Sequence, residues 1–320
     1  MDDQKKILDE INRHQRFLVA AHHNPDADAA ASSLSVAIML KTMGKKVVVV
    51  NEDDLPQWLK FLPQAKLSKK AKAVKPFVYD VAIMCDCGDL ERIGGVKSLL
   101  IAGKPMINID HHVTNTRFGT VNWVGKDTSS TSEMIYDLLQ YARIGINKQL
   151  AHLLYVGIMT DTGSFRYDNV SAKTHAIVAD LMRFKINAQD MYERLYVGMP
   201  VVDMKLFAKV IQDAQLSHDD KVFCVSLSSQ SSQIFSKSFD LKDKLFGFLR
   251  SVEGIEVVVI LTQINSKEVR INLRSQGPVN VAKLAQLFNG GGHPKAAGGK
   301  MAGSLENVKK RVLNALKKVL

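Results

Sequence analysis

Cysteine is scarce in this sequence, with three residues in 320: Cys85, Cys87 and Cys224. Three thiols cannot build a disulfide framework. The spacing of Cys85 and Cys87 is too short for a zinc knuckle, and a second cysteine pair is lacking. A chain with few cysteines and no such pattern is typical of a reducing compartment. We therefore expect a cytoplasmic protein without structural disulfides.

Long apolar runs are also absent. No stretch reaches the roughly 18 apolar residues of a membrane-spanning helix, and the first residues begin an amphipathic helical pattern instead of the apolar core of a signal peptide. Aromatic residues make up only 7% of the chain and are not interleaved with a basic stripe, which disfavours a surface for long nucleic acids. The formal net charge of +11 favours an anionic partner such as a nucleotide or a short nucleic acid.

Short apolar runs alternate with helical patterns in the first part of the chain, and several of these runs are apolar on both faces. This pattern predicts a parallel sheet covered by helices on both sides. The strands we expect in that sheet are 16–21, 45–51, 79–85 and 105–109. The pattern changes at Lys221, after which strands of a second sheet are expected at 223–227, 256–261 and 268–273.

The length suggests two domains, at roughly 150 residues each. The fold class we expect is α/β, with a parallel-sheet domain at 1–195, a helical linker at 196–217 and a smaller α/β domain at 218–320. Ser130 and Glu133 match a capping box at the start of a helix, which by itself explains both residues.

Acidic and histidine side chains follow four separate apolar elements. Such groups are costly at the mouth of a buried strand unless something charged holds them, and a divalent metal is the usual holder. Their position at the ends of several elements therefore suggests one site. In chain order, the residues are His22, Asp26, Asp28, Asp86, Asp110, His111, His112 and Asp161.

The spacing of these residues fits two neighbouring ions. Asp26 and Asp28 lie two residues apart in a loop and can point to different ions, while Asp86 could bridge both through its two oxygens. His111 and Asp161 would complete the second ion's ligands. Oxygen-rich sites with one imidazole per ion suit manganese or magnesium, and two such ions generate hydroxide and clamp a phosphoryl group. Each motif alone is more often a turn, a cap or a surface pair, so the prediction rests on their joint occurrence.

The segment 289–299 is the one glycine-rich loop that we expect. Its three consecutive glycines would let backbone N–H groups approach an anion closely. It lacks the Lys-Ser/Thr of a P-loop and the spacing of a dinucleotide fingerprint. Arg274 and His293 could grip a terminal phosphate or stack on a base. The alternative is a tight turn in which His293 is an exposed bystander.

The order and wording of these motifs resemble the DHH phosphoesterase superfamily over nearly the whole chain, and the length is most similar to its NrnA-type subgroup. The N-terminal motifs that carry the resemblance are His22-x-x-Pro25-Asp26-x-Asp28-Ala29, Asp86-Cys87-Gly88-Asp89, Asp110-His111-His112 and Asp161-Thr162-Gly163. The C-terminal motifs, which resemble the DHH-associated substrate domain, are Leu273-Arg274-Ser275 and Gly290-Gly291-Gly292-His293.

The resemblance implies a manganese-dependent phosphoesterase with two ions, for which magnesium is a possible substitute. The first ion would be held by His22, Asp26 and Asp86. The second would be held by Asp28, Asp86, His111 and Asp161. His112 would face the scissile phosphate, and Asp110 would orient an imidazole by accepting its N–H.

The resemblance also implies substrates and partners. NrnA-type proteins hydrolyse short oligonucleotides (nanoRNA) to 5′-mononucleotides and 3′-phosphoadenosine 5′-phosphate to AMP and phosphate, by hydroxide attack on phosphorus. Homodimers are expected from the subgroup. The residues expected to bind the substrate are Arg274, Ser275, Gly291, Gly292 and His293.

Two other functions remain open from the sequence. A stand-alone phosphodiesterase for pApA or cyclic di-AMP would carry the same metal and Gly-His motifs. From a different class, a non-enzymatic nucleic-acid-binding protein would use the +11 charge and bind long RNA or DNA without metal. A pyrophosphatase or a long-strand exonuclease of the same superfamily is less favoured, because the motifs and the length fit them less well.

Overall fold

The structure is a computed structural model, and it describes residues 3–75, 77–197, 199–233 and 241–320. It divides into two compact units, Met1–Val197 and Gly198–Leu320, called here the first and the second unit. Each unit has its own sheet and core. Among the described helices, none has the length and apolarity needed to cross a membrane.

The first unit is built on a six-stranded sheet in the order β3-β2-β1-β4-β5-β6, and all five strand pairs are parallel. The α/β class predicted from the sequence is confirmed. Its strands are β1 (Arg16–Ala20), β2 (Lys46–Asn51), β3 (Ser68–Lys70), β4 (Val81–Cys85), β5 (Met106–Asp110) and β6 (Val121–Val124). Its α-helices are α1 (Asp3–Arg13), α2 (Ala27–Thr42), α3 (Thr131–Tyr141), α4 (Lys148–Asp161), α5 (Ala172–Met182) and α6 (Ala188–Tyr196).

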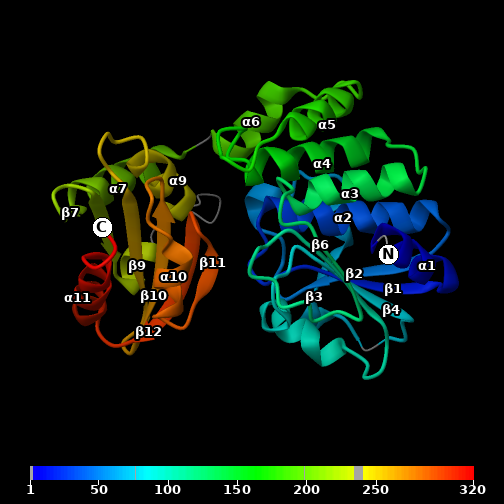
Figure 1. The fold of residues 1–320 in the computed structure, drawn as a ribbon, viewed down its shortest axis with the longest axis horizontal. Coiled ribbons are helices and arrows are strands. Elements are labelled where there is room, and N and C mark those ends of the chain that lie inside the picture. Colours follow the sequence, from blue (N-terminus) through cyan, green and yellow to red (C-terminus); the bar gives the residue numbers. More distant parts are fainter. Residues whose placement is uncertain (1–2, 76, 198, 234–240) are drawn as a thin grey trace. The chain divides into compact units, whose positions relative to one another are not determined.

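Both faces of this sheet are buried, as the doubly apolar strands require. In β1, Phe17 and Val19 pack into the core formed with α1 to α4, whereas Leu18 and Ala20 pack into a second core on the opposite face. Figure 1 shows α2, α3 and α4 layered on one side of the sheet. The opposite face is covered by 3₁₀ segments, which are η3 (Ala71–Ala73) and η4 (Leu90–Leu99); two more, η1 (Gln57–Leu59) and η2 (Ala65–Leu67), precede them.

The chain changes direction across this sheet at β1, which pairs with β2 on one side and with β4 on the other. In open parallel sheets, ligands bind in the crevice outside the carboxyl ends of the strands at such a switch point. Here β1 and β4 end at Ala20 and Cys85, and the neighbouring β5 ends at Asp110. The polar residues that follow these strands are therefore brought to one edge of the sheet.

The second unit contains a mixed sheet in the order β11-β12-β10-β9-β8-β7, in which only β8 and β9 pair in parallel. One face packs on α10 and α11, and part of the other face packs on α7 and α9. Its strands are β7 (Gln215–Ser217), β8 (Val222–Leu227), β9 (Val257–Asn265), β10 (Glu268–Ser275), β11 (Gly291–His293) and β12 (Ala296–Ala302). Its helices are α7 (Val201–Gln212), α8 (Ser229–Gln233), α9 (Leu241–Leu249), α10 (Val281–Gln286) and α11 (Leu305–Leu316).

Two features of the second unit differ from the sequence analysis. The segment 289–299, expected as a loop, contains β11 and the first part of β12, which pair with each other. Glycine has little strand propensity, so a glycine-rich sequence does not predict strands. This hairpin nevertheless needs its glycines, because the two strands approach each other closely. A side chain at Gly290 would overlap the Gly298 carbonyl oxygen. A Cβ at Gly292 would lie 2.5 Å from the Ala296 carbonyl oxygen. The expected linker, 196–217, contains α7 and also β7, which joins the second sheet. Its action as a linker stays a prediction.

Candidate active site

His22 follows β1 and is buried, with 4% of its surface exposed. Its Nδ1 lies 2.8 Å from the His23 carbonyl oxygen. A carbonyl only accepts hydrogen bonds, so Nδ1 carries a proton. In the neutral ring Nε2 then holds the lone pair that a metal ion requires. This Nε2 lies 3.7 Å from Asp26 Oδ2 and 3.5 Å from Asp86 Oδ2.

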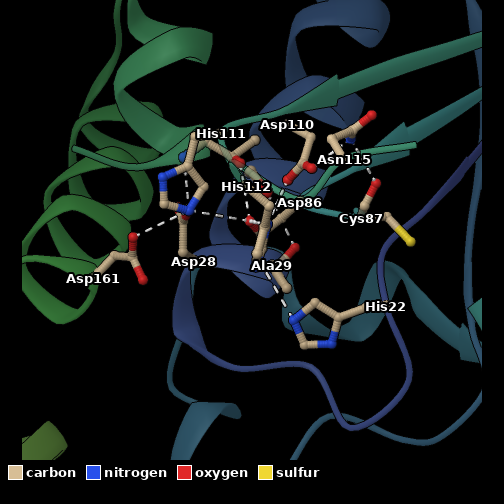
Figure 2. Close-up of polar contacts among 12 residues, drawn as sticks. His22, Asp28, Ala29, Asp86, Cys87, Asp110, His111, His112, Asn115 and Asp161 are labelled. Carbon is tan, nitrogen blue, oxygen red and sulfur yellow. Dashed lines mark hydrogen bonds and ion pairs between the residues drawn. The ribbon is translucent and has the colours of Figure 1, made fainter. Parts of the chain in front are cut away.

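Asp86 follows β4 and occupies the centre of the cluster (Figure 2). Its backbone is left-handed, with φ of 53°, and its side chain is almost fully buried. While Oδ2 faces His22, Oδ1 lies 3.7 Å from His111 Nε2 and 3.6 Å from His112 Nδ1. The two oxygens thus face imidazoles on different sides, which is the arrangement that a bridging carboxylate needs.

Asp28 lies in the first turn of α2 and is clamped by the N-terminus of α3. Its Oδ2 accepts the Thr131 N–H at 2.7 Å, and its Oδ1 accepts the Ser132 N–H at 2.9 Å. The Thr131 hydroxyl also donates to Asp86 Oδ1 at 3.0 Å. One helix end therefore orients two of the predicted metal ligands.

His111 directly follows β5, and Asp161 is the last residue of α4. His111 Nε2 lies 3.2 Å from Asp161 Oδ2. The described residues include several groups of three with ligand atoms within 4.8 Å of one another, and two of these groups consist entirely of predicted metal ligands and share Asp86. They are His22, Asp26 and Asp86, and Asp28, Asp86 and His111. All six metal-ligand residues predicted from the sequence are thus brought together.

His112 and Asp110 form a hydrogen-bonded pair next to Asp86. Asp110 is completely buried, and its Oδ1 lies 2.6 Å from His112 Nδ1. Its Oδ2 accepts a hydrogen bond from Asn115 Nδ2 at 2.5 Å, and the same amide lies 2.8 Å from Asn108 Oδ1. The sequence analysis predicted the pair but missed Asn108, Asn115 and Thr131. A polar Asn108 inside an apolar strand was the one available signal.

The charges of the cluster perturb several pKa values. Burial lowers the pKa of His22, but Asp26 and Asp86 raise it by more, to about 10. Burial and the neighbouring Asp86 raise the pKa of Asp28 to about 7, and burial with Asp28 and Asp86 raises that of Asp161 well above its usual range. Burial opposes ionisation of Asp86 too, yet His22 and the other imidazoles hold its pKa below the usual range.

This donor set fits a pair of hard divalent cations. Several buried carboxylates converge within a few ångströms, and such a cluster is stable in ionised form only with compensating positive charge. Each of the two groups offers carboxylate oxygens and one imidazole nitrogen. Manganese and magnesium prefer such oxygen-rich sites, whereas zinc and copper favour more nitrogen or sulfur.

Other residues near the motifs have structural contacts. Both the backbone N–H and the Nδ1 of His23 lie within 2.7 Å of the Arg92 carbonyl oxygen, so its ring contacts η4 and not the carboxylates. Of the predicted capping box, Ser130 Oγ accepts the Glu133 N–H at 3.0 Å. The Glu133 carboxylate instead accepts the Ser129 and Thr174 hydroxyls at 2.5 and 2.9 Å.

The predicted substrate residues lie in the second unit. Arg274 in β10 and His293 in β11 are both register partners of Ala296 in β12, so they share one face of the sheet. The Arg274 guanidinium lies over the Phe246 ring, 4.8 Å from its centroid. Ser275 is buried on the opposite face, and its hydroxyl lies 3.3 Å from the Gly277 carbonyl.

Comparison with known proteins shows which protein family this chain is similar to. Residues 16–158 match the DHH family, N-terminal domain, and residues 238–320 match the DHHA1 domain. The chain belongs to the DHH family. It is therefore an enzyme of the phosphoesterase type, as the motifs predicted.

The relatives are similar over most of their length. A protein of Thermus thermophilus named bifunctional oligoribonuclease and PAP phosphatase NrnA is 30% identical over 304 residues, covering 94% of this chain and 89% of that protein. A protein of the same name from Bacillus subtilis is 28% identical, covering 92% and 91%. The crystal structure of an exopolyphosphatase-related protein from Bacteroides fragilis has a TM-score of 0.87 at 26% identity, covering 99% and 96%.

Proposed function

We propose that this DHH-family enzyme uses Mn²⁺ to hydrolyse short oligonucleotides to 5′-mononucleotides and 3′-phosphoadenosine 5′-phosphate to AMP and phosphate. The observation that carries the proposal is the pair of ligand groups that share Asp86. The names of the Thermus and Bacillus relatives support both substrates. Both reactions break a bond between phosphorus and a ribose 3′ oxygen, so one set of catalytic groups can serve both.

In the proposed centre, one ion would be held by His22, Asp26 and Asp86, and the other by Asp28, Asp86, His111 and Asp161. When bound, the two ions supply positive charge that stabilises the phosphoryl oxygens and favours deprotonation of the attacking water. The protein's part is to fix the ligands before substrate arrives. The amide clamp on Asp28 and the His23 carbonyl on His22 do this through hydrogen bonds to the side chains.

His112 is the proposed catalytic group for the leaving oxygen. Because Asp110 accepts the Nδ1 proton at 2.6 Å, the ring is held in one orientation. Burial lowers the pKa of His112, but Asp110 raises it by more, so the imidazolium form is favoured. Protonated His112 can then stabilise negative charge on the substrate or give its Nε2 proton to the 3′ oxygen as the phosphorus–oxygen bond breaks.

Substrate binding is also assigned to the face of the second sheet that carries Arg274 and His293. Their common partner in the sheet is Ala296, whose side chain is small. The side chains of Arg274 and His293 can therefore both contact a phosphate or a base on this face. Gly290 and Gly292 are explained by close backbone pairing. A Cβ at Gly291, however, would meet no described atom within 4 Å, so packing does not explain this exposed glycine. Close approach of a ligand to the backbone would explain a glycine at this position.

Compartment and assembly are part of the proposal. The thiols of Cys85, Cys87 and Cys224 are all free and buried, which suits a protein of the reducing cytoplasm. A homodimer is proposed from the subgroup that the sequence resembles.

The experiment is a comparison of substrates with the purified protein and Mn²⁺, each with an EDTA control. The substrates are RNAs of two to five nucleotides, 3′-phosphoadenosine 5′-phosphate, pApA and cyclic di-AMP. Turnover of the short RNAs and phosphate release from the bisphosphate, both lost with EDTA, are the expected results. Turnover restricted to pApA and cyclic di-AMP would contradict the substrate assignment. Metal-independent binding of long RNA without any turnover would favour the non-enzymatic alternative.

A further inference from the structure

Gly157 is an interior residue of α4 and is buried. Glycine in the middle of a helix lowers stability relative to alanine, because it gives up more backbone freedom on folding. A buried glycine inside a helix therefore raises the question of whether a side chain has room there. The residues packed against Gly157 show what occupies that room.

A Cβ built on Gly157 would overlap Ser132 Oγ, and it would lie 2.6 Å from Asp28 Oδ1 and 2.7 Å from Ser132 Cβ. All of these distances are shorter than real Cβ contacts, so a side chain at 157 would force its neighbours to move. Ser132 and Asp28 are both buried and cannot swing into solvent. The space left by the missing side chain is filled by the first turn of α3 and by the carboxylate that this turn holds.

The position of that carboxylate depends on a close fit. Asp28 Oδ1 accepts the Ser132 N–H at 2.9 Å, and Oδ2 accepts the Thr131 N–H at 2.7 Å. The backbone N–H of Ser132 thus reaches Asp28 at the place where the first turn of α3 lies directly against Gly157.

We propose that Gly157 is a positioning residue of the metal centre: by having no side chain, it lets the N-terminus of α3 close on Asp28 and aim this carboxylate at the metal. The inference rests on the proposed metal site. It adds a residue that touches neither metal nor substrate. A mere packing role predicts only a change in stability, whereas a positioning role predicts a change in metal affinity.

The test is Gly157→Ala, with Gly247→Ala as the matched control. Gly247 also lies inside a helix, α9, but its Cβ would meet no described atom within 4 Å. The readouts are far-ultraviolet circular dichroism, the Mn²⁺ dissociation constant measured from free Mn²⁺ by electron paramagnetic resonance, and kcat and KM for 3′-phosphoadenosine 5′-phosphate. For Gly157→Ala we expect a folded protein whose Mn²⁺ dissociation constant rises about 10- to 100-fold, the range seen when groups that orient metal ligands are removed. Its kcat should fall more than its KM rises, and Gly247→Ala should match the wild type.

A second variant, Gly157→Ala with Ser132→Gly, covers the case in which the single variant does not fold. It removes both Ser132 atoms from the clash but leaves Asp28 Oδ1 at 2.6 Å, so Mn²⁺ affinity should remain weakened. Wild-type Mn²⁺ affinity in either folded variant would overturn the inference while leaving the proposed metal site intact. Absence of Mn²⁺ binding by the wild-type protein would instead overturn the proposed site, and this inference with it.

Discussion

At the scale of single residues, the site depends on backbone positions as much as on side-chain chemistry. Asp86 has a positive φ, a conformation that aspartate and asparagine tolerate better than most residues. This turn directly after β4 points its two oxygens at imidazoles from two other strand ends, His22 and His111.

The raised pKa of His22 leads to a prediction about protons. With a pKa of about 10, the imidazole of the metal-free protein is protonated at about pH 8. A metal ion needs the unprotonated Nε2, so binding must release that proton, and acidification must oppose binding. Mn²⁺ affinity should therefore rise with pH up to about 10. Calorimetric titration in two buffers of different ionisation enthalpy measures the protons released.

His22→Gln is the control for this titration, because it has no proton to lose at this position. It should release fewer protons than the wild type under the same conditions. Binding of Mn²⁺ by the wild type at about pH 8 with no proton release would contradict the prediction that His22 gives up a proton to bind the metal.

The residue types of the site could be predicted from the sequence, but the groups that orient them could not. The Asp-His-His and Asp-x-Asp motifs are recognisable because acids and imidazoles are unusual after apolar strands. Asn115 and Thr131 carry no such signal, since both amino acids are common in turns and at helix ends. Their roles arise from contacts across long sequence separations, such as that of Thr131 with Asp86.

At the scale of elements, α3 connects the metal centre to the outer helices. Its first turn holds Asp28, and its buried Glu133 accepts the Ser129 and Thr174 hydroxyls. Lys173 adds a charge 3.3 Å from Glu133 Oε1. The short sequence pattern predicted a local capping box, but the glutamate reaches α5 instead, because tertiary partners outcompete the local one.

Glu133→Ala should therefore lower the free energy of unfolding of the first unit by roughly 2–4 kcal/mol, since it leaves buried hydroxyls without their acceptor. Both tryptophans, Trp58 and Trp123, lie in that unit. Urea denaturation followed by tryptophan fluorescence thus reports on the first unit alone.

Glu91→Ala is the control, because the Glu91 side chain is 84% exposed and forms only a surface ion pair with Lys97. Exposed pairs contribute little, so its denaturation midpoint should stay near that of the wild type. Equal midpoints for Glu133→Ala and Glu91→Ala would contradict the anchoring role of α3.

In the first sheet, the sequence predicted the strands β1, β2, β4 and β5. Their sequences are apolar runs, which are typical of strands buried on both faces. The missed strands are short or glycine-rich. β3 is only Ser68–Lys70 and reads as a surface lysine segment, while β11 consists of two glycines and His293. Such strands are specified by their neighbours in the sheet and not by their own pattern.

At the scale of the whole molecule, the chain combines a cluster of buried carboxylates with a formal net charge of +11. The positive charge is therefore carried by the rest of the chain, where it would favour association with the anionic substrates proposed above. The two units divide the proposed work. The first unit carries the metal ligands and the His112–Asp110 pair, and the second carries the face with Arg274 and His293.

The most direct test of the central claim is a Mn²⁺ titration of chelator-treated protein, with phosphate release from 3′-phosphoadenosine 5′-phosphate as the readout. The variant to compare is Asp86→Asn, since asparagine suits the positive φ and keeps the size of the side chain. The account predicts that the wild type is inactive without metal and regains activity with about two Mn²⁺ per chain. Asp86→Asn should fold normally but turn over at least about 100-fold more slowly. Full activity of the chelated wild type, or near-normal turnover by Asp86→Asn, would contradict the two-metal account.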